Sequence, residues 1–142
     1  MMMQSWMGSD FTNDDLVTES SLLKDYEHKL LGEDSINGRK VWKIELKPKA
    51  DAAVVWGKVV LHIDQKEYIH LKTEFYDEEE DLVNVMTAKK IGNLGGKILP
   101  VIVEMEPVAE PGHKTILQYH QLDFSVNIPR EHFTTQYMKR VR

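Results

Sequence analysis

Short stretches of alternating apolar and polar residues recur along this chain about every ten residues, separated by turn-forming residues. Segment 39–47 shows the pattern, with Trp42, Ile44 and Leu46 alternating with Lys43, Glu45 and Lys47. A period of two places the apolar side chains on one face of a strand and the charged ones on the other. Repeated between turns, the pattern predicts a meandering antiparallel sheet and a mainly all-β fold.

The alternation predicts strands at 24–31, 39–47, 54–64, 68–77, 82–91, 97–106 and 114–124. Asn37-Gly38 can supply the positive φ angles of a tight turn between the first two strands, and residues 92–96 carry the glycines of a later turn. We expect the strands to follow one another in chain order and to curl into a partial, open barrel.

A short helix is predicted before the first strand. Thr12 is followed three residues later by Asp15, which is the spacing of a capping box, so the helix should run from Asn13 to about Glu19. At the other end, segment 128–133 is predicted to be a short turn or helical cap. We expect Phe133 to fill an open end of the sheet.

Length and composition fit a single domain over residues 1–142, with 42% hydrophobic and 29% charged residues. The net charge of −5 argues against nucleic-acid binding, which needs a basic surface. The absence of cysteine excludes disulfides and thiol catalysis. No stretch has the ~18 to 20 apolar residues that a membrane span needs, and the first residues lack a signal sequence. Either the protein stays inside the cell, or its export signal lies upstream of this piece.

The sequence predicts no catalytic residue, metal site or cofactor. His62 and His70 could face each other across two strands, but two imidazoles are too few for a metal site. The acidic run 78–81 lacks the ligand pattern of a calcium loop, and no serine lies in a Gly-x-Ser-x-Gly elbow. An enzyme acting on lipid is therefore the weakest of the functional readings.

Several strings resemble the outer-membrane lipoprotein-sorting (LolA-like) family. They are Met-Gln-Ser-Trp-Met-Gly-Ser-Asp-Phe-Thr-Asn-Asp-Asp-Leu at 3–16, Val55-Trp56-Gly57-Lys58-Val59, the Phe75-Tyr76-Asp77 turn entry, and Ile128-Pro129 with Phe133. The resemblance covers nearly the whole chain. Family members carry further sequence before the first string, so this chain looks like the C-terminal portion of a longer LolA-like domain.

The resemblance implies an open LolA/LolB-like half-barrel whose apolar concave face takes acyl chains. It implies a non-enzymatic periplasmic carrier of lipoprotein acyl chains or other lipids, served by an inner-membrane transporter and an outer-membrane acceptor. The alternative is a lipoprotein-sensing or protein-interaction module of the same fold. Strands missing from the sheet would leave an exposed edge, through which a homodimer could form.

Periodicity alone predicts that the residues of the apolar stripes belong to an ordinary core. The resemblance makes these residues candidates for contact with lipid. The candidate residues are Trp42, Ile44, Leu46, Trp56, Val59, Leu61, Ile63, Leu71, Phe75, Val101, Val103 and Met105. The Met-rich start, Met1 to Met7 with Trp6, is either a mobile hydrophobic lid or a strand or linker cut from its upstream partners.

Overall fold

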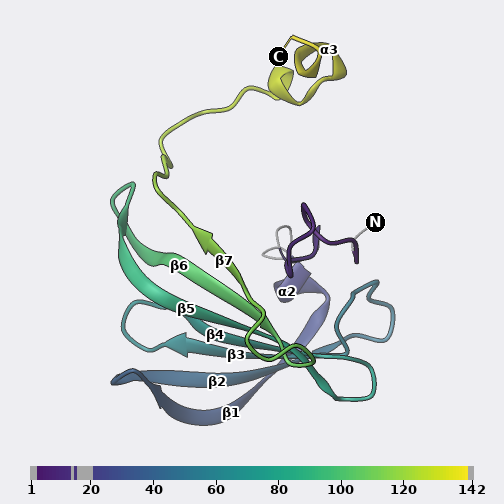
Figure 1. Ribbon diagram of the computed structural model, residues 1–142, viewed down its shortest axis with the longest axis vertical. Coiled ribbons are helices and arrows are strands. Elements are labelled where there is room, and N and C mark those ends of the chain that lie inside the picture. Colours follow the sequence, from purple (N-terminus) through teal and green to yellow (C-terminus); the bar gives the residue numbers. More distant parts are fainter. Residues whose placement is uncertain (1–2, 14, 16–20, 141–142) are drawn as a thin grey trace.

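The computed structural model of the protein describes residues 3–13, 15 and 21–140, and a seven-stranded antiparallel sheet dominates it (Figure 1). The strands are β1 (Tyr26–Ile36), β2 (Arg39–Pro48), β3 (Lys58–Asp64), β4 (His70–Tyr76), β5 (Leu82–Leu94), β6 (Lys97–Pro107) and β7 (Thr115–Gln118). The short helices are α2 (Ser21–Lys24), the 3-10 helix η2 (Arg130–Phe133) and α3 (Thr135–Met138). Among the described residues, no helix combines the length and hydropathy needed to cross a membrane.

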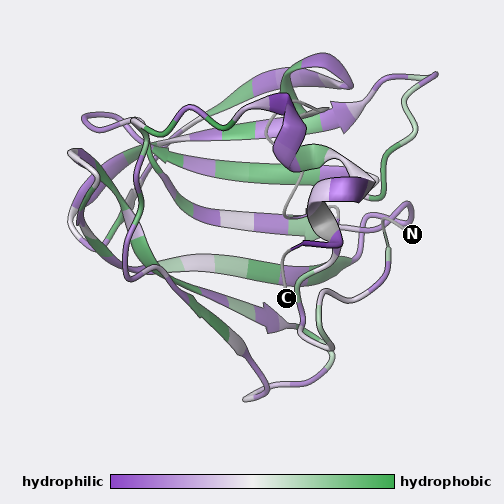
Figure 2. Cartoon of the chain, turned by 90° about the horizontal axis from the view of Figure 1, so that it is seen from above, coloured by the Kyte–Doolittle hydropathy of each residue, from purple (hydrophilic) through white to green (hydrophobic). Residues whose placement is uncertain are grey.

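The strands lie in the sheet in the order in which they occur along the chain, each antiparallel to the next. Seen from above, they follow a curve that does not close, so β1 and β7 form two separate edges (Figure 2). The predicted fold, a mainly antiparallel β structure curled into an open barrel, is thus confirmed.

The predicted tight turns are present, but they are shorter than expected. Asn37 and Gly38 have φ angles of 50° and 77°, so β1 continues to the residue before this pair. Gly95 and Gly96, with φ angles of 60° and 81°, likewise let β5 run up to Leu94. Gly32 stays inside β1 because the register shifts beside it, which accommodates one extra residue as a bulge.

Two further strand boundaries also differ from the prediction. Segment 54–57 is not part of β3. Instead, Gly57 lies close to the backbone of residues 76–78, just after β4. Its N–H donates to the Tyr76 carbonyl at 3.1 Å, and a Cβ there would lie 2.7 Å from the Asp77 carbonyl carbon. The last strand, predicted to reach residue 124, ends at Gln118.

After β7 the chain leaves the sheet as an arm, residues 119–140, that ends in α3 away from the strands (Figure 1). The prediction that Phe133 fills an open end of the sheet was therefore wrong. This side chain lies in η2 and is 75% exposed.

The main core lies on one face of the sheet. Its buried members are Phe11, Tyr26, Leu46, Trp56, Val59, Leu61, Phe75 and Met105. The core includes Phe11 from the N-terminal segment (residues 3–13), so this segment packs against the sheet. The predicted capping box is also present: the Thr12 N–H donates to Asp15 Oδ2 at 2.7 Å, and the Asp15 N–H donates to Thr12 Oγ1 at 3.3 Å. Most of the helix predicted to follow it lies outside the described residues.

Candidate functional site

A cavity of about 530 Å³ lies on the core face of the sheet. Strands β1 and β3 to β7 contribute to its wall, together with the N-terminal segment, α2 and the first part of the arm. The lining residues are Phe11, Asp15, Leu22, Tyr26, Trp56, Val59, Leu61, Tyr68, Ile69, His70, Leu71, Lys72, Thr73, Phe75, Met86, Ala88, Leu99, Pro100, Val103, Leu117, Tyr119, Leu122 and Phe124. Most of these side chains are apolar, so the cavity offers a surface that favours hydrocarbon over water.

The N-terminal segment forms a compact turn that covers part of the cavity. An isolated β-bridge joins Ser5 to Thr12, and the Trp6 N–H donates to the Phe11 carbonyl at 2.7 Å. This folding directs Phe11 into the cavity wall, where its side chain is only 3% exposed. Trp6 packs against the same core.

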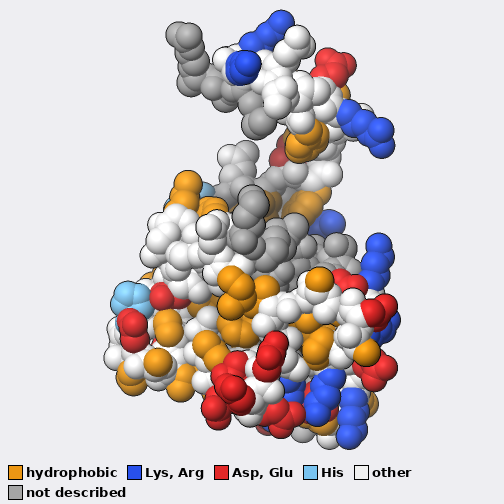
Figure 3. Space-filling model, turned by 90° about the vertical axis from the view of Figure 1, so that its right-hand side faces the viewer, with side chains coloured by type: hydrophobic (Ala, Val, Ile, Leu, Met, Phe, Trp, Pro, Cys, Tyr) orange, Lys and Arg blue, Asp and Glu red, His pale blue; other side chains and the backbone are white. Residues whose placement is uncertain are grey.

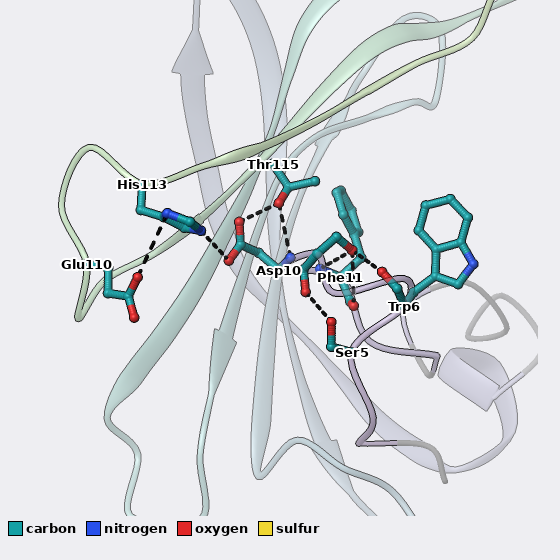
Figure 4. Close-up of polar contacts among 8 residues, drawn as sticks. Ser5, Trp6, Asp10, Phe11, Glu110, His113 and Thr115 are labelled. Atoms are coloured by element: carbon teal, nitrogen blue, oxygen red, sulfur yellow. Dashed lines mark hydrogen bonds and ion pairs between the residues drawn. The ribbon is translucent and has the colours of Figure 1, made fainter.

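A group of polar contacts, which we call the clasp, fastens this segment to β7 and the turn before it (Figure 4). The Asp10 N–H donates to Thr115 Oγ1 at 3.0 Å, and the Thr115 hydroxyl donates to Asp10 Oδ2 at 2.5 Å. His113 Nε2 lies 3.2 Å from Asp10 Oδ1, and its Nδ1 lies 3.9 Å from a Glu110 oxygen. The clasp does not resemble a catalytic triad, because the hydroxyl contacts the carboxylate and not the imidazole.

The arm borders the cavity on another side through Leu122 and Phe124. It is held against the β5–β6 turn, where a Cβ on Gly95 would lie 2.6 Å from the Leu122 carbonyl oxygen. The Lys97 ammonium lies 4.3 Å from the centroid of the Phe124 ring, a cation–π contact. Glycine at this turn thus allows the arm to approach closely enough to complete the wall.

Three buried polar atoms lie among the apolar side chains that line the cavity. They are Trp56 Nε1, Thr73 Oγ1 and Asp15 Oδ1, and none has a hydrogen-bond partner among the described residues. The Trp56 ring is fixed by packing against Phe75, with ring centroids 5.1 Å apart. Trp56 and Thr73 are 6% and 3% exposed, so bulk water does not readily reach either group.

Burial raises the pKa of the Asp15 carboxyl, although hydrogen bonds from the Thr12 backbone and hydroxyl act in the opposite direction. The Trp56 indole N–H, the polar group next to this carboxyl, also acts to lower its pKa. The raised pKa means that the wall around Asp15 disfavours negative charge.

The residues predicted from the apolar stripes fall into two groups. The cavity wall contains Trp56, Val59, Leu61, Leu71, Phe75 and Val103. Outside it lie Trp42, Ile44, Leu46, Ile63, Val101 and Met105. In this second group Leu46 and Met105 are fully buried, and the Trp42 ring packs against Tyr68 at 5.8 Å between centroids. Whether either group contacts a lipid stays a prediction.

The part of the wall that lies outside the long strands was not predicted from the sequence. Phe11 and Leu22 precede the sheet, while Leu122 and Phe124 follow it. The position of Thr73 could have been predicted, since it alternates with Leu71 and Phe75 on one strand face. It was not selected because its side chain carries a hydroxyl and the candidates were apolar residues.

The two histidines considered as a metal pair do not face each other. A register shift in the β3–β4 hairpin places His62 opposite Lys72, and His70 opposite Ile63. The His62 side chain is buried, with 3% exposure, and this burial lowers its pKa. Within the described part of the chain, no group of three or more His, Asp or Glu side chains is arranged to hold a metal ion.

A protein-family model described only as an uncharacterized protein matches residues 1–140. The chain belongs to this family. No curated protein matches it.

Solved structures show what the fold is. A DUF1329 family protein from Desulfovibrio piger has 21% identity and a TM-score of 0.86, covering 95% of this chain and 55% of its own. A domain described as an outer membrane lipoprotein-sorting protein domain, from Vibrio parahaemolyticus, has 26% identity, a TM-score of 0.83 and coverages of 98% and 58%. A LolA superfamily protein from Nitrosomonas europaea has 24% identity, a TM-score of 0.78 and coverages of 96% and 61%.

These neighbours confirm the predicted resemblance to LolA-like proteins, and the chain has a LolA-like fold. It spans between 55% and 61% of the length of the neighbouring chains.

Proposed function

We propose that this protein is a non-enzymatic carrier that binds the acyl chains of lipoproteins, or of other lipids, in the cavity on the core face of its sheet. The apolar lining of that cavity is the observation that carries the proposal. The LolA-like fold supports it, because two of the neighbours are described as a lipoprotein-sorting domain and a LolA superfamily protein.

The size of the cavity suits such a ligand. Its volume of about 530 Å³ lies within the range of ~300 to 1,000 Å³ that is typical of small-molecule sites. Each methylene group moved from water into it contributes about 0.8 kcal/mol, so a chain of about twelve carbons contributes on the order of 10 kcal/mol before ordering costs. Binding of this strength needs no catalytic group and no cofactor.

We further propose that the carrier works in the periplasm. A periplasmic protein of this kind would receive its cargo from an inner-membrane transporter and pass it to an outer-membrane acceptor.

The edge strand β1 adds a further candidate contact, because within the described chain it pairs only with β2 and carries the exposed side chains of Leu30 and Leu31. A second copy of the chain could pair there, which would make a homodimer.

Two adjacent residues of β7 offer a matched test. Leu117 lines the cavity, whereas Ile116 is 56% exposed. We expect Leu117→Asn to weaken binding of the fluorescent apolar probe N-phenyl-1-naphthylamine at least tenfold, because the amide adds a polar group to the wall. Ile116→Asn should change the affinity less than twofold. Fluorescence titration of the purified variants measures both values.

Equal loss in both variants would assign probe binding to the outer surface, and no binding by the unmodified protein would refute the cavity as a ligand site. Native mass spectrometry of the protein purified from cells would then identify the natural cargo. A bound phospholipid or acylated peptide supports the carrier, while a ligand-free dimer indicates that the apolar surface is covered by self-association.

A sensor or protein-interaction module is the second candidate, and the arm favours it. The arm projects from the body of the molecule, and hydrophobic side chains reach the surface on the side viewed in Figure 3. In the arm, Val126, Ile128 and Phe133 are 59%, 56% and 75% exposed. Exposed apolar side chains of this kind favour a surface that binds another protein. Truncation after Ser125 should leave probe binding unchanged, and a sensor would then lose binding of its protein partner.

A further inference from the structure

The distal part of the arm carries a charge opposite to that of the rest of the molecule. Residues 126–142 contain four Lys or Arg residues and one acidic residue, which gives a net charge of +3. Residues 1–125 contain 14 Lys or Arg residues and 22 Asp or Glu residues, which gives a net charge of −8. An acidic protein thus carries a short basic segment, and such a segment favours a negatively charged partner.

The structure folds this segment into a compact unit, which we call the arm tip (residues 126–140). Its two short helices, η2 and α3, meet through the rings of His132 and Tyr137, whose centroids lie 4.3 Å apart. The Thr134 hydroxyl joins the two helices, because it donates to the Glu131 carbonyl at 2.8 Å and accepts from the Tyr137 N–H at 3.3 Å. The arm tip therefore presents its other side chains from a defined surface.

Basic and apolar side chains are exposed together on the arm tip. Arg130 begins η2, and Lys139 and Arg140 follow α3; all three are exposed. Within the part of the chain that the structure describes, no ion pair engages any of them. Ile128 and Phe133 are also mostly exposed. In Figure 3, Lys and Arg side chains gather on the projecting end at the top.

This combination matches the surface of a lipid bilayer. A bilayer of anionic lipid offers phosphate groups to the basic side chains and hydrocarbon directly below them to the apolar ones. Protein interfaces, in contrast, are depleted in lysine and in charged residues at their centre. The arm also separates the tip from the acidic sheet (Figure 1). Salt screens charges over about 8 Å at physiological ionic strength, so this separation weakens repulsion between the sheet and the lipid.

We propose that the arm tip docks the protein on the surface of an anionic lipid bilayer. Arg130, Lys139 and Arg140 contact lipid phosphates, while Ile128 and Phe133 enter the boundary between headgroups and hydrocarbon. A few basic residues together with two apolar side chains give reversible attachment and no permanent anchoring. This docking surface is separate from the cavity, and it does not depend on the cavity being a ligand site.

The test is sedimentation of the full chain with sucrose-loaded vesicles of phosphatidylglycerol, compared with vesicles of uncharged phosphatidylcholine. Each Lys or Arg near an anionic surface strengthens binding roughly fivefold. We therefore expect binding to phosphatidylglycerol to be stronger by roughly tenfold or more, and high salt should release the protein from these vesicles.

Matched double variants locate the electrostatic contribution. Lys139→Gln with Arg140→Gln removes two basic side chains from the arm tip and should weaken binding to phosphatidylglycerol roughly 20-fold. Lys29→Gln with Lys40→Gln removes the same charge from exposed positions of β1 and β2. This control should change binding less than about twofold, because charges far from the bilayer are screened.

A second pair of variants tests the apolar contribution. Phe133→Ser should weaken vesicle binding roughly tenfold, because a buried aromatic side chain is lost from the boundary region. Ile116→Ser removes an exposed apolar side chain from β7 and should leave vesicle binding unchanged. Truncation after Ser125 should abolish vesicle binding.

Equal binding to the two kinds of vesicle, or equal losses in the tip variants and their controls, would overturn the proposal. Vesicle binding that survives truncation after Ser125 would also overturn it and would leave the arm as a surface for a protein partner. Binding of N-phenyl-1-naphthylamine should be the same in all these variants. Failure of vesicle binding with intact probe binding would therefore leave the carrier function standing, and the reverse result would leave the docking surface standing.

Discussion

Replacing Thr115 with valine is expected to release the N-terminal segment while leaving the sheet folded. The variant loses both hydrogen bonds of the clasp that involve the hydroxyl, one from the Asp10 N–H and one to its carboxylate. A neutral hydrogen bond contributes about 1 kcal/mol and a charge-assisted one about 2 kcal/mol. Because His113 still contacts the partly exposed Asp10 carboxylate, we expect a net loss of about 2 kcal/mol from the local closing equilibrium.

A loss of this size raises the open fraction of the segment about 30-fold. Hydrogen exchange measures it directly, since the Trp6, Ser9 and Asn13 amides donate to carbonyls within the same segment. Their exchange should accelerate in Thr115→Val, whereas strand amides of β3 and β4 should not change. Thr87→Val is the matched control on the sheet.

The reasoning would be refuted if the segment exchanged at its original rate in Thr115→Val. It would also fail if every amide in the sheet accelerated equally, because the hydroxyl would then stabilise the whole fold and not the clasp. Probe affinity should fall together with protection of the segment, because Phe11 forms part of the cavity wall.

Two other substitutions test packing and electrostatics. Gly57→Ala should destabilise the protein by about 3 kcal/mol in urea unfolding, since its Cβ would overlap backbone atoms, whereas Gly92→Ala meets only a valine side chain and should cost less. Burial raises the pKa of the Glu74 carboxyl, but Lys72 and the Tyr76 hydroxyl outweigh burial and hold that pKa below its ordinary value of 4.5. The stability from this carboxylate is present above pH 4.5 and disappears as the pH falls through the lowered pKa, so the unfolding free energies of the unmodified protein and Glu74→Gln should converge in acid. A constant difference between them down to the lowest pH would contradict this.

The sheet could be predicted from the sequence because its strands and turns are specified locally. The alternation around Trp42 and the Asn37-Gly38 pair predicted β2 to within one residue of its end. The pattern cannot tell whether an apolar residue is paired in a sheet or packs against it from outside. For that reason Leu122 and Phe124 were assigned to a strand, although they belong to the arm and line the cavity.

The cavity could be predicted only in part, because its wall combines distant segments. Trp56 was selected as an aromatic residue of a strand, but it precedes β3, so its contact with Phe75 does not follow from alternation. Thr73 could be placed on the inward face, yet its lack of a partner depends on the side chains of two neighbouring strands. Such a property becomes visible only when the register of the sheet is known.

The strand order also has a consequence for how the molecule assembles. Each strand pairs with its neighbour along the chain, so successive hairpins can form with short loops to close. The Asp10–Thr115 contact joins residues 105 positions apart, and the entropy of closing that loop is lost before its hydrogen bonds form. We therefore expect the N-terminal segment, which covers part of the cavity, to fold last. It does so although it lies near the beginning of the chain.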